Sequence, residues 1–211
     1  MQTGVIIRRL KRQYSKTIFI SKNHKEGAFY VLISCILSQR TKDEVTYPAA
    51  KRLFMLANNP KAMLKLPLKT IEKAIYPSGF YITKAKRIKE VSKYLLKNHN
   101  GTVPNTYENL LRIKGVGRKT AGIVLTHAFQ IPALPIDTHC HRIANRIGWA
   151  RTKTPDETEF ALMKVIPKKE WLELNELLVK HGQSICKPIS PFCSRCIIGK
   201  YCRKTGVKKS R

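Results

Sequence analysis

The chain is poor in acidic side chains. Its 211 residues include 13 Asp and Glu against 41 Lys and Arg, a formal net charge of +28 at pH 7. Solubility of a small domain needs a net charge of only about 2 to 8, so solubility does not account for this surplus. A surplus this large indicates a polyanionic partner, and nucleic acid fits better than an anionic membrane surface. The charge predicts no sequence preference, because phosphate contacts position a protein without reading bases.

Long apolar runs are also missing. The longest, Ala28 to Leu37, is far shorter than the roughly 20 residues that a membrane helix needs. The first residues, MQTGVIIRRLKRQ, contain no apolar core of a signal peptide, so we expect no export. The expected location is the cytoplasm or nucleoid, or the nucleus in a eukaryote. Hydrophobic residues make up 43% of the chain, enough to form the core of one large domain or two small lobes.

No segment alternates long enough to predict a strand, and we find no repeat or low-complexity block. Apolar residues instead recur at helical spacing. Helices are predicted over residues 28–38, 42–56, 68–76, 84–97, 119–129, 139–147, 155–165 and 170–181, with a short one between 57 and 67. One more is expected to start at a cap on Asn105 or Thr106 and to end at KGVG. The basic tail, residues 204–211, is expected to be frayed. The predicted fold class is all-α.

The stretch LLRIKGVGRKTAGIVL, residues 110–125, predicts a helix, a glycine turn and a second helix. Gly115 and Gly117 suit a tight turn and the close approach of another backbone. The second helix begins with unpaired N–H groups and a partial positive charge, so amides from Gly115 through Val116 and Gly117 to Arg118 could hold a DNA phosphate. An ordinary helical hairpin packed for stability is the alternative. The net charge of +28 favours the phosphate interpretation.

Four of the six cysteines lie close together near the end of the chain. Cys186, Cys193, Cys196 and Cys202 follow the spacing C-x6-C-x2-C-x5-C. A disulfide framework is not expected without an export signal, whereas four thiolates so close in sequence can surround one metal centre. Zinc sites usually pair two C-x-x-C knuckles and this set has only one, so the spacing leaves zinc and iron–sulfur both open. Cys35, in an apolar run, is expected to be a buried small hydrophobe.

LRIKGVGRKTAGIVL, PIDTHCHRIANRIG and the cysteine spacing together resemble the endonuclease III family of DNA glycosylases, from about Ala28 to Cys202. The resemblance implies a two-lobed, all-α helix-hairpin-helix glycosylase fold with a C-terminal [4Fe–4S] cluster loop. It implies a helical-bundle lobe over residues 22–133, with the hairpin at about 107–129. The cluster-bearing lobe would combine residues 1–21 with 134–211, and the cluster loop would span 186–202.

The resemblance assigns the catalytic pair to Lys119, directly after GVGR, and Asp137 in PIDTHC. A protonated lysine is a weak nucleophile, and a helix N-terminus with neighbouring cations favours the neutral amine. A carboxylate can stabilise cationic sugar character or accept a proton. Without the resemblance, Lys119 would be one more phosphate contact and Asp137 a helix N-cap. The triplet His139, Cys140 and His141 is interpreted as packing and hydrogen bonding, because residues two apart on a helix point apart.

The resemblance also implies two loops that enter the duplex. ILSQRTKD resembles the segment that fills the gap left by a flipped nucleotide; several relatives carry glutamine where this chain has Arg40, preceded by Gln39. This departure leaves the opposite-strand contacts open. Phe80 resembles the apolar wedge of the second loop, and a core aromatic is the alternative. Lys84, in the basic segment between Ile82 and Lys97, is counted among the DNA-binding residues.

Three functions follow as hypotheses. The first is a bifunctional glycosylase and abasic-site lyase that removes oxidised pyrimidines from double-stranded DNA, acting as a monomer with a [4Fe–4S] cluster. The second is a monofunctional glycosylase for mismatched adenine or thymine, which Lys119 argues against because such relatives lack lysine after GVGR. The third is a non-enzymatic DNA-binding module, which the pairing of Lys119 with Asp137 argues against.

Overall fold

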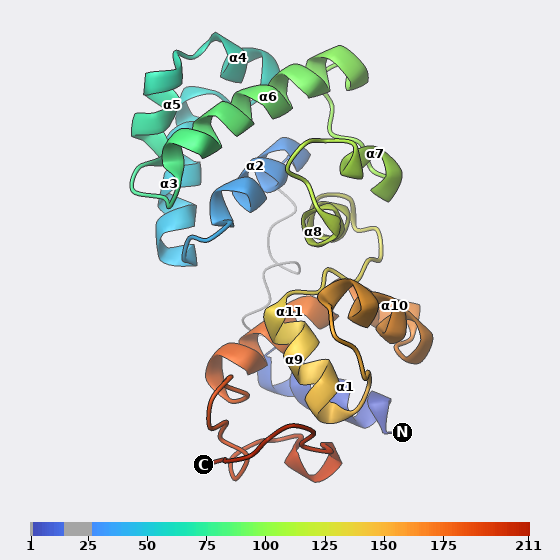
Figure 1. The fold of residues 1–211 in the computed structure, drawn as a ribbon. Helices are drawn as coiled ribbons and strands as arrows, with labels where there is room; N and C mark the ends of the chain where they lie inside the picture. Colours follow the sequence, from blue (N-terminus) through green and yellow to red (C-terminus); the bar gives the residue numbers. More distant parts are fainter. Residues whose placement is uncertain (1, 15–26) are drawn as a thin grey trace. The chain divides into compact units, whose positions relative to one another are not determined.

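The structure is a computed structural model that describes residues 2–14 and 27–211. The described residues form helices and loops and contain no strand, as the all-α prediction required (Figure 1). None of the described helices is long and apolar enough to cross a membrane. Of the described residues, 27–130 form one compact unit, and 2–14 with 131–211 form the other. The predicted lobe boundary at 21/22 lies outside the described residues.

The unit at 27–130 is a helical bundle built around α2 (Ala28–Ser38), the most apolar helix. Phe29, Leu32, Ile33 and Leu37 of α2 are buried, and α2 packs against α3, α6 and α8 (Figure 1). The remaining helices are α3 (Asp43–Leu56), α4 (Pro60–Lys65), α5 (Leu68–Ile75), α6 (Tyr81–His99), α7 (Tyr107–Leu111) and α8 (Arg118–Phe129).

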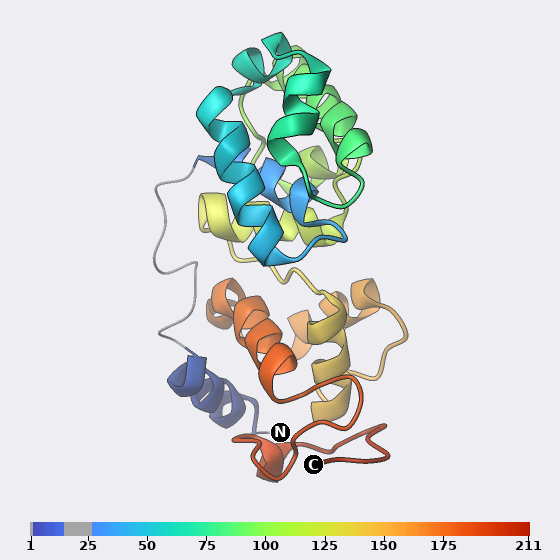
Figure 2. The same ribbon diagram turned by 90° about the vertical axis from the view of Figure 1, so that its left-hand side faces the viewer.

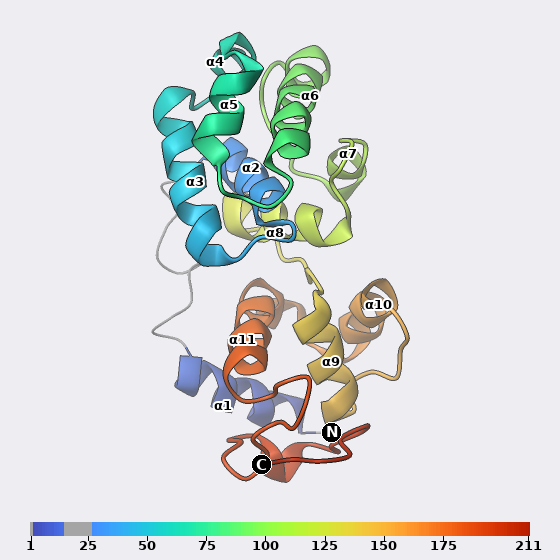
Figure 3. The same cartoon turned by 60° about the vertical axis from the view of Figure 1, so that its left-hand side comes forward.

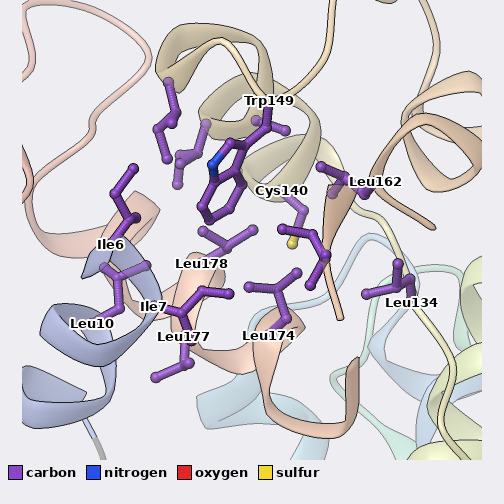
Figure 4. Close-up of a cluster of buried hydrophobic side chains, with 14 of the residues drawn as sticks. Ile6, Ile7, Leu10, Leu134, Cys140, Trp149, Leu162, Leu174, Leu177 and Leu178 are labelled. Atoms are coloured by element: carbon purple, nitrogen blue, oxygen red, sulfur yellow. The ribbon is translucent and has the colours of Figure 1, made fainter. Parts of the chain in front are cut away.

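The other unit joins both ends of the chain. It contains α1 (Thr3–Tyr14), α9 (Thr138–Ile147), α10 (Pro155–Val165) and α11 (Trp171–Ser184), with short 3-10 turns at Lys168–Glu170 and Gly199–Tyr201. Its core brings together residues of α1, α9, α10 and α11, including Leu10, Cys140, Leu162 and Leu177, with Trp149 from the segment after α9 (Figure 4). Helix α11 packs against α9 and against α1, and Figures 2 and 3 show α1 beside α11.

Helix α1 was not predicted, because dense basic residues mask the helical spacing of its apolar residues. Ile6, Ile7, Leu10 and Tyr14 recur at helical intervals and are buried. Lys11 extends this attachment, with its Nζ 2.8 Å from Glu170 and 2.7 Å from Glu173. The N-terminal segment therefore belongs to the C-terminal core through burial and ion pairing.

The predicted helices are confirmed to within a few residues at most ends, and α2 and α10 have the predicted bounds. The expectation of a frayed tail is wrong. The backbone N–H of Ser194 donates to the carbonyl of Arg211 at 3.1 Å, and the Arg211 N–H donates to Pro191 at 2.8 Å. The Arg211 guanidinium also lies 4.0 Å from the centroid of the Phe192 ring. These contacts fix the tail against the cysteine loop.

The packing of α11 on α9 predicts a cost for adding one methyl group. A Cβ on Gly182 would lie 2.6 Å from His139 Nδ1 and 2.9 Å from its Cβ, whereas a Cβ on Gly4, also helical, would meet nothing within 4 Å. Gly182→Ala should therefore lower the free energy of unfolding by about 1–3 kcal/mol. Gly4→Ala should leave it unchanged or slightly raised. Denaturant unfolding of both variants checks this, and equal stabilities would contradict the close packing.

Candidate nucleic-acid interface and cysteine loop

The glycine turn between α7 and α8 depends on one left-handed residue. Gly115 has φ +88°, a conformation that L side chains rarely adopt, and a Cβ there would lie 3.0 Å from Nε of Arg87. Val116 is 6% exposed and anchors the turn in the bundle. Gly117 is the N-cap of α8, with an extended backbone and open space where a side chain would be. The two glycines thus have different structural roles. Gly115 makes the turn, and Gly117 leaves the helix N-terminus uncovered.

Lys119 is the second residue of α8 and is exposed. The Arg118 guanidinium before it lies 4.9 Å from the centroid of the Tyr107 ring on α7. Cys35 on α2, which is partly buried, lies within electrostatic range of Lys119. Burial raises the pKa of this thiol to about 12, and the charge of Lys119 acts in the opposite direction. The turn therefore presents the Lys119 amine at an accessible helix N-terminus.

The two predicted insertion loops meet in space. Arg40 and Phe80 are both exposed and both left-handed, with φ of 53° and 58°. The Arg40 guanidinium lies 5.6 Å from the centroid of the Phe80 ring. Phe80 is 63% exposed, so the core-aromatic alternative is wrong. Gln39 Nε2 donates to the Gly115 carbonyl at 3.3 Å, which links the first loop to the hairpin turn.

An open cavity of about 300 Å³ lies among these elements. Its lining includes Gln39, Arg40, Phe80, Arg87 and Gly115, so both loops and the hairpin turn contribute. Lys84 also lines it, so three basic side chains line the cavity, of which Arg87 is paired with Glu90 at 2.9 Å. Within this unit, Gln39 and Arg40 of the first loop, Phe80 of the second and Gly115 of the hairpin therefore line one cavity.

Lys84 is buried rather than displayed. Its side chain belongs to a residue that is 5% exposed, and Nζ donates to the Leu37 carbonyl at 2.6 Å and to Thr41 Oγ1 at 2.8 Å. Burial lowers the pKa of Lys84 to about 8. The ammonium is thus bound by oxygens of the bundle at the wall of the open cavity, which Lys84 also lines, and contact with a phosphate stays a prediction.

Asp137 caps α9 in the other unit. Its Oδ1 accepts a hydrogen bond from the Cys140 N–H at 2.8 Å, which satisfies one of the free amides at the helix start. The following histidines have protein partners, as the packing interpretation predicted. His139 Nδ1 is 3.0 Å from an Arg142 guanidinium nitrogen, and His141 Nδ1 is 2.6 Å from Thr158 Oγ1. The cap fixes the direction of the Asp137 carboxylate, whose charge also acts on the guanidinium of Arg142.

The C-terminal cysteines Cys186, Cys193, Cys196 and Cys202 line one small cavity of about 20 Å³. Burial raises the pKa of the Cys196 thiol to about 11 and also raises that of Cys202, and the neighbouring cysteines act in the same direction. Among residues 2–14 and 27–211, no three His, Cys, Asp or Glu side chains are grouped to hold a metal ion. As a donor set, four thiols around one cavity fit the Cys₄ ligation of an iron–sulfur cluster.

Three of these sulfurs have nitrogen partners. An Arg146 guanidinium nitrogen is 3.3 Å from Cys186 Sγ, and the backbone N–H of Lys204 is 3.3 Å from Cys202 Sγ. His181 is 1% exposed, and its Nε2 lies 3.5 Å from Cys196 Sγ. Hydrogen bonds of this kind stabilise thiolates and tune a cluster held by them. The same Arg146 side chain donates to the Lys187 and Pro188 carbonyls, which shapes the loop.

Residues 33–168 match the HhH-GPD superfamily of base excision DNA repair proteins. Endonuclease III of Thermotoga maritima is 47% identical over 182 residues, which cover 86% of this chain and 85% of that protein. The chain belongs to the endonuclease III family. Endonuclease III homolog 2 of Arabidopsis thaliana, described as chloroplastic, is 43% identical over 84% of this chain, and the match spans 48% of the plant protein.

The fold of this chain is also similar to that of solved endonuclease III structures. A structure described as a trapped endonuclease III–DNA covalent intermediate superposes with a TM-score of 0.86 at 32% identity, covering 96% of this chain and 95% of that one. A thermostable thymine-DNA glycosylase has a TM-score of 0.84 at 22% identity, which shows the shared fold. The two-lobed glycosylase fold expected from the sequence is thereby confirmed.

Sequence reasoning missed three side chains that organise these sites in this endonuclease III-family chain. Thr41 connects the two insertion loops, and Arg146 and His181 contact the cysteine loop. Thr41 lies in the segment ILSQRTKD, where the sequence assigns it no role. Its contacts with Gly79 and Lys84 show that it connects the two loops. Arg146 and His181 lie on helices 40 and 15 residues before their cysteine partners, so no local motif connects them.

The cap on α9 predicts that two substitutions of Asp137 will differ in stability. Asp137→Asn keeps an oxygen that can accept from the Cys140 N–H, whereas Asp137→Ala removes the acceptor. Asn should therefore leave the free energy of unfolding nearly unchanged, and Ala should lower it by about 1 kcal/mol. Urea unfolding measures both. A loss as large for Asn as for Ala would show that the charge, rather than the cap, stabilises the helix.

Proposed function

We propose that this chain removes oxidised pyrimidines from duplex DNA and then cuts the abasic strand, with Lys119 as nucleophile and Asp137 as its carboxylate partner. As a member of the endonuclease III family, the chain is a bifunctional DNA glycosylase and abasic-site lyase of base excision repair. The lesion class and the residue roles are the proposed part. The non-enzymatic alternative does not agree with this membership.

The exposed amine of Lys119 at the start of α8 carries the assignment of the nucleophile. It follows a turn whose second glycine leaves open space, so a DNA backbone can approach the helix N-terminus closely. The 32%-identical endonuclease III has been solved as a trapped covalent DNA intermediate, and such an intermediate requires a protein nucleophile. A lysine two residues beyond a phosphate-binding turn is suited to meet C1′ of the bound nucleotide.

The proposed reaction has two stages. The neutral amine of Lys119 attacks C1′, the N-glycosidic bond breaks, and the base leaves with the bonding electron pair and takes up a proton. Loss of a proton from nitrogen and opening of the C1′–O4′ bond, with O4′ protonated, give a Schiff base. The Schiff base acidifies the C2′ hydrogen; its removal forms a C2′–C3′ double bond and expels the 3′ phosphate with the C3′–O3′ electron pair.

Asp137 is proposed to stabilise the cationic sugar and to accept a proton during these steps. Its cap to the Cys140 N–H at 2.8 Å supports the role, because the helix start holds the carboxylate in a fixed orientation. A carboxylate whose orientation is fixed beforehand loses less conformational freedom in a transition state.

DNA recognition is proposed to use the hairpin amides at Gly115–Arg118 for a phosphate and the Arg40 and Phe80 side chains for the duplex interior. The phosphate contacts would position the strand, and insertion of Arg40 and Phe80 would replace the stacking lost when the target nucleotide turns out. The exposed pairing of Arg40 with Phe80, at 5.6 Å, supports this proposal. The predicted opposite-strand contact is therefore assigned to Arg40 in this proposal.

The nucleophile is tested by trapping. With borohydride, the wild-type protein should form a covalent adduct on duplexes that contain an oxidised pyrimidine or an abasic site, because hydride reduces the Schiff base to a stable amine. Lys119→Gln should abolish the adduct while DNA binding falls less than about threefold, since one phosphate contact at most is lost. Lys114→Gln, which removes an equal charge from the same exposed turn, should still form the adduct.

Two outcomes would contradict these assignments. An adduct formed by Lys119→Gln at the wild-type rate would move the nucleophile to another lysine. Excision on mismatched adenine or thymine duplexes, with none on oxidised pyrimidines, would replace the proposed substrate class.

We further propose that Cys186, Cys193, Cys196 and Cys202 hold a [4Fe–4S] cluster, the group that the endonuclease III family typically carries. The group supplies a structural crosslink when bound. The four thiols lining one cavity support this, and so do the nitrogen donors to Cys186 and Cys202 and the contact of His181 with Cys196. We propose that the unit carrying this loop is the cluster-bearing lobe and that the bundle at 27–130 is the hairpin lobe.

Metal analysis tests the cluster. Protein made with iron available should be brown and contain about four irons and four labile sulfides per chain. Cys196→Ser should lose iron, whereas Cys35→Ser, a change in the other unit, should keep it. Stoichiometric zinc without iron in the wild-type protein would rule out the proposed cluster.

A further inference from the structure

The two residues proposed to enter the duplex share an unusual backbone conformation. Arg40, between α2 and α3, and Phe80, between α5 and α6, both lie in the left-handed region. For a residue with a Cβ this conformation costs roughly 1–2 kcal/mol, so the neighbouring structure must hold it in place. In each loop, the holding contact is made by the adjacent residue.

Thr41, next to Arg40, joins the two loops through one hydroxyl group. Its Oγ1 accepts from the Gly79 N–H at 3.1 Å and from Lys84 Nζ at 2.8 Å, and donates to the Gln39 carbonyl over a longer 3.4 Å. A hydroxyl has one hydrogen to donate and two lone pairs, so every position is used. Gly79 directly precedes Phe80, and a Cβ on it would lie 3.0 Å from the Arg40 carbonyl. The loops therefore meet at Thr41 and at a glycine that allows the contact.

Lys84 supplies the charge that holds this junction. Besides Thr41, its Nζ binds the Leu37 carbonyl at 2.6 Å, one of the free carbonyls at the end of α2. A cation is stabilised there by the negative end of the helix dipole. Although burial lowers the pKa of Lys84 to about 8, the ammonium form predominates at neutral pH. Lys84 thus connects the start of α6 to the end of α2 and to Thr41.

We propose that Thr41 and Lys84 are positioning residues for base excision, which hold Arg40 and Phe80 in the orientation that enters the duplex. The inference rests on the proposed insertion role of that pair. Turning a nucleotide out of the stack costs a few kcal/mol, and side chains ordered before binding can replace the stacking without an added entropy cost. Neither Thr41 nor Lys84 needs to touch DNA for this effect.

Thr41→Val tests the junction because it keeps the shape of the side chain and removes the hydroxyl. Under single-turnover conditions, it should slow excision of an oxidised pyrimidine from a matched duplex about tenfold, the effect of losing about 1.4 kcal/mol of positioning. The enzyme concentration at half-maximal rate should change less than about twofold, because the phosphate contacts remain. Thr41→Ser, which keeps the hydroxyl, should excise at close to the wild-type rate.

A matched control separates this effect from the loss of any buried threonine hydroxyl. Thr46, on α3, is 3% exposed and its Oγ1 donates to the Lys42 carbonyl. Thr46→Val should leave excision unchanged. Thermal unfolding of each variant is measured alongside. If Thr41→Val does not fold, Lys84→Met, which removes the ammonium from the same hydroxyl, should give the same slowing.

A second substrate distinguishes positioning from a purely structural defect, which would slow excision equally on both substrates. When the lesion sits in a bulge with no opposite nucleotide, stacking is already disrupted and less insertion is needed. The deficit of Thr41→Val should then shrink to less than about threefold. An equal deficit on matched and bulged substrates, equal losses for Val and Ser, or wild-type excision by Thr41→Val would overturn the positioning role.

The proposed insertion of Arg40 and Phe80 is tested separately, with the variants Arg40→Ala and Phe80→Ala. If neither slows excision from the matched duplex, the proposed insertion is wrong and the junction has nothing to position. If both slow it while Thr41→Val does not, the insertion stands and the positioning role fails. Where both hold, adding Thr41→Val to Phe80→Ala should slow excision less than the product of the single effects, because coupled residues are not additive.

Discussion

The N-terminus of α8 depends on one backbone turn. Gly115 reverses the chain at φ +88°, and the burial of Val116 directly after it pins the turn to the bundle. Helix α8 starts from this turn with uncovered amides at Gly117. Lys119 is the second residue of the helix. A side chain at 115 would meet Arg87, so the turn also sets how closely α6 can approach the hairpin. The placement of the proposed nucleophile is thus a consequence of local backbone geometry.

The charge imbalance has a structural counterpart. Several of the 13 acidic residues serve local structure: Asp137 caps α9, Glu170 and Glu173 bind Lys11, and Glu72 lies near Lys69. Acids used in this way do little to offset 41 basic residues elsewhere, so the surface stays strongly cationic. Self-repulsion of this size is relieved when a polyanion binds and releases its counterions.

Lys119 and Lys84 occupy distinct environments. Lys119 is exposed at a helix N-terminus, where an amine can reach a ligand. Lys84 is buried against the C-terminal carbonyls of α2, where a charge stabilises a helix end. Two side chains with the same chemistry thus differ in role because helix termini of opposite polarity surround them. The family motif predicts a role for Lys119, and the contacts show the environment of Lys84.

The sequence alone determined the helical class, the bounds of most helices, the hairpin and the four-cysteine loop, because each depends on residues close together in the chain. Periodicity, caps and spacing are local signals. Helix α1 carried such a signal, but its basic residues obscured it. The burial of Lys84, the junction at Thr41, the contacts of His181 and Arg146 with the cysteine loop, and the fixing of the tail were decided by the tertiary structure. Each of these joins residues from separate helices or loops, and such contacts form only once the apolar faces have packed, so no local pattern records them.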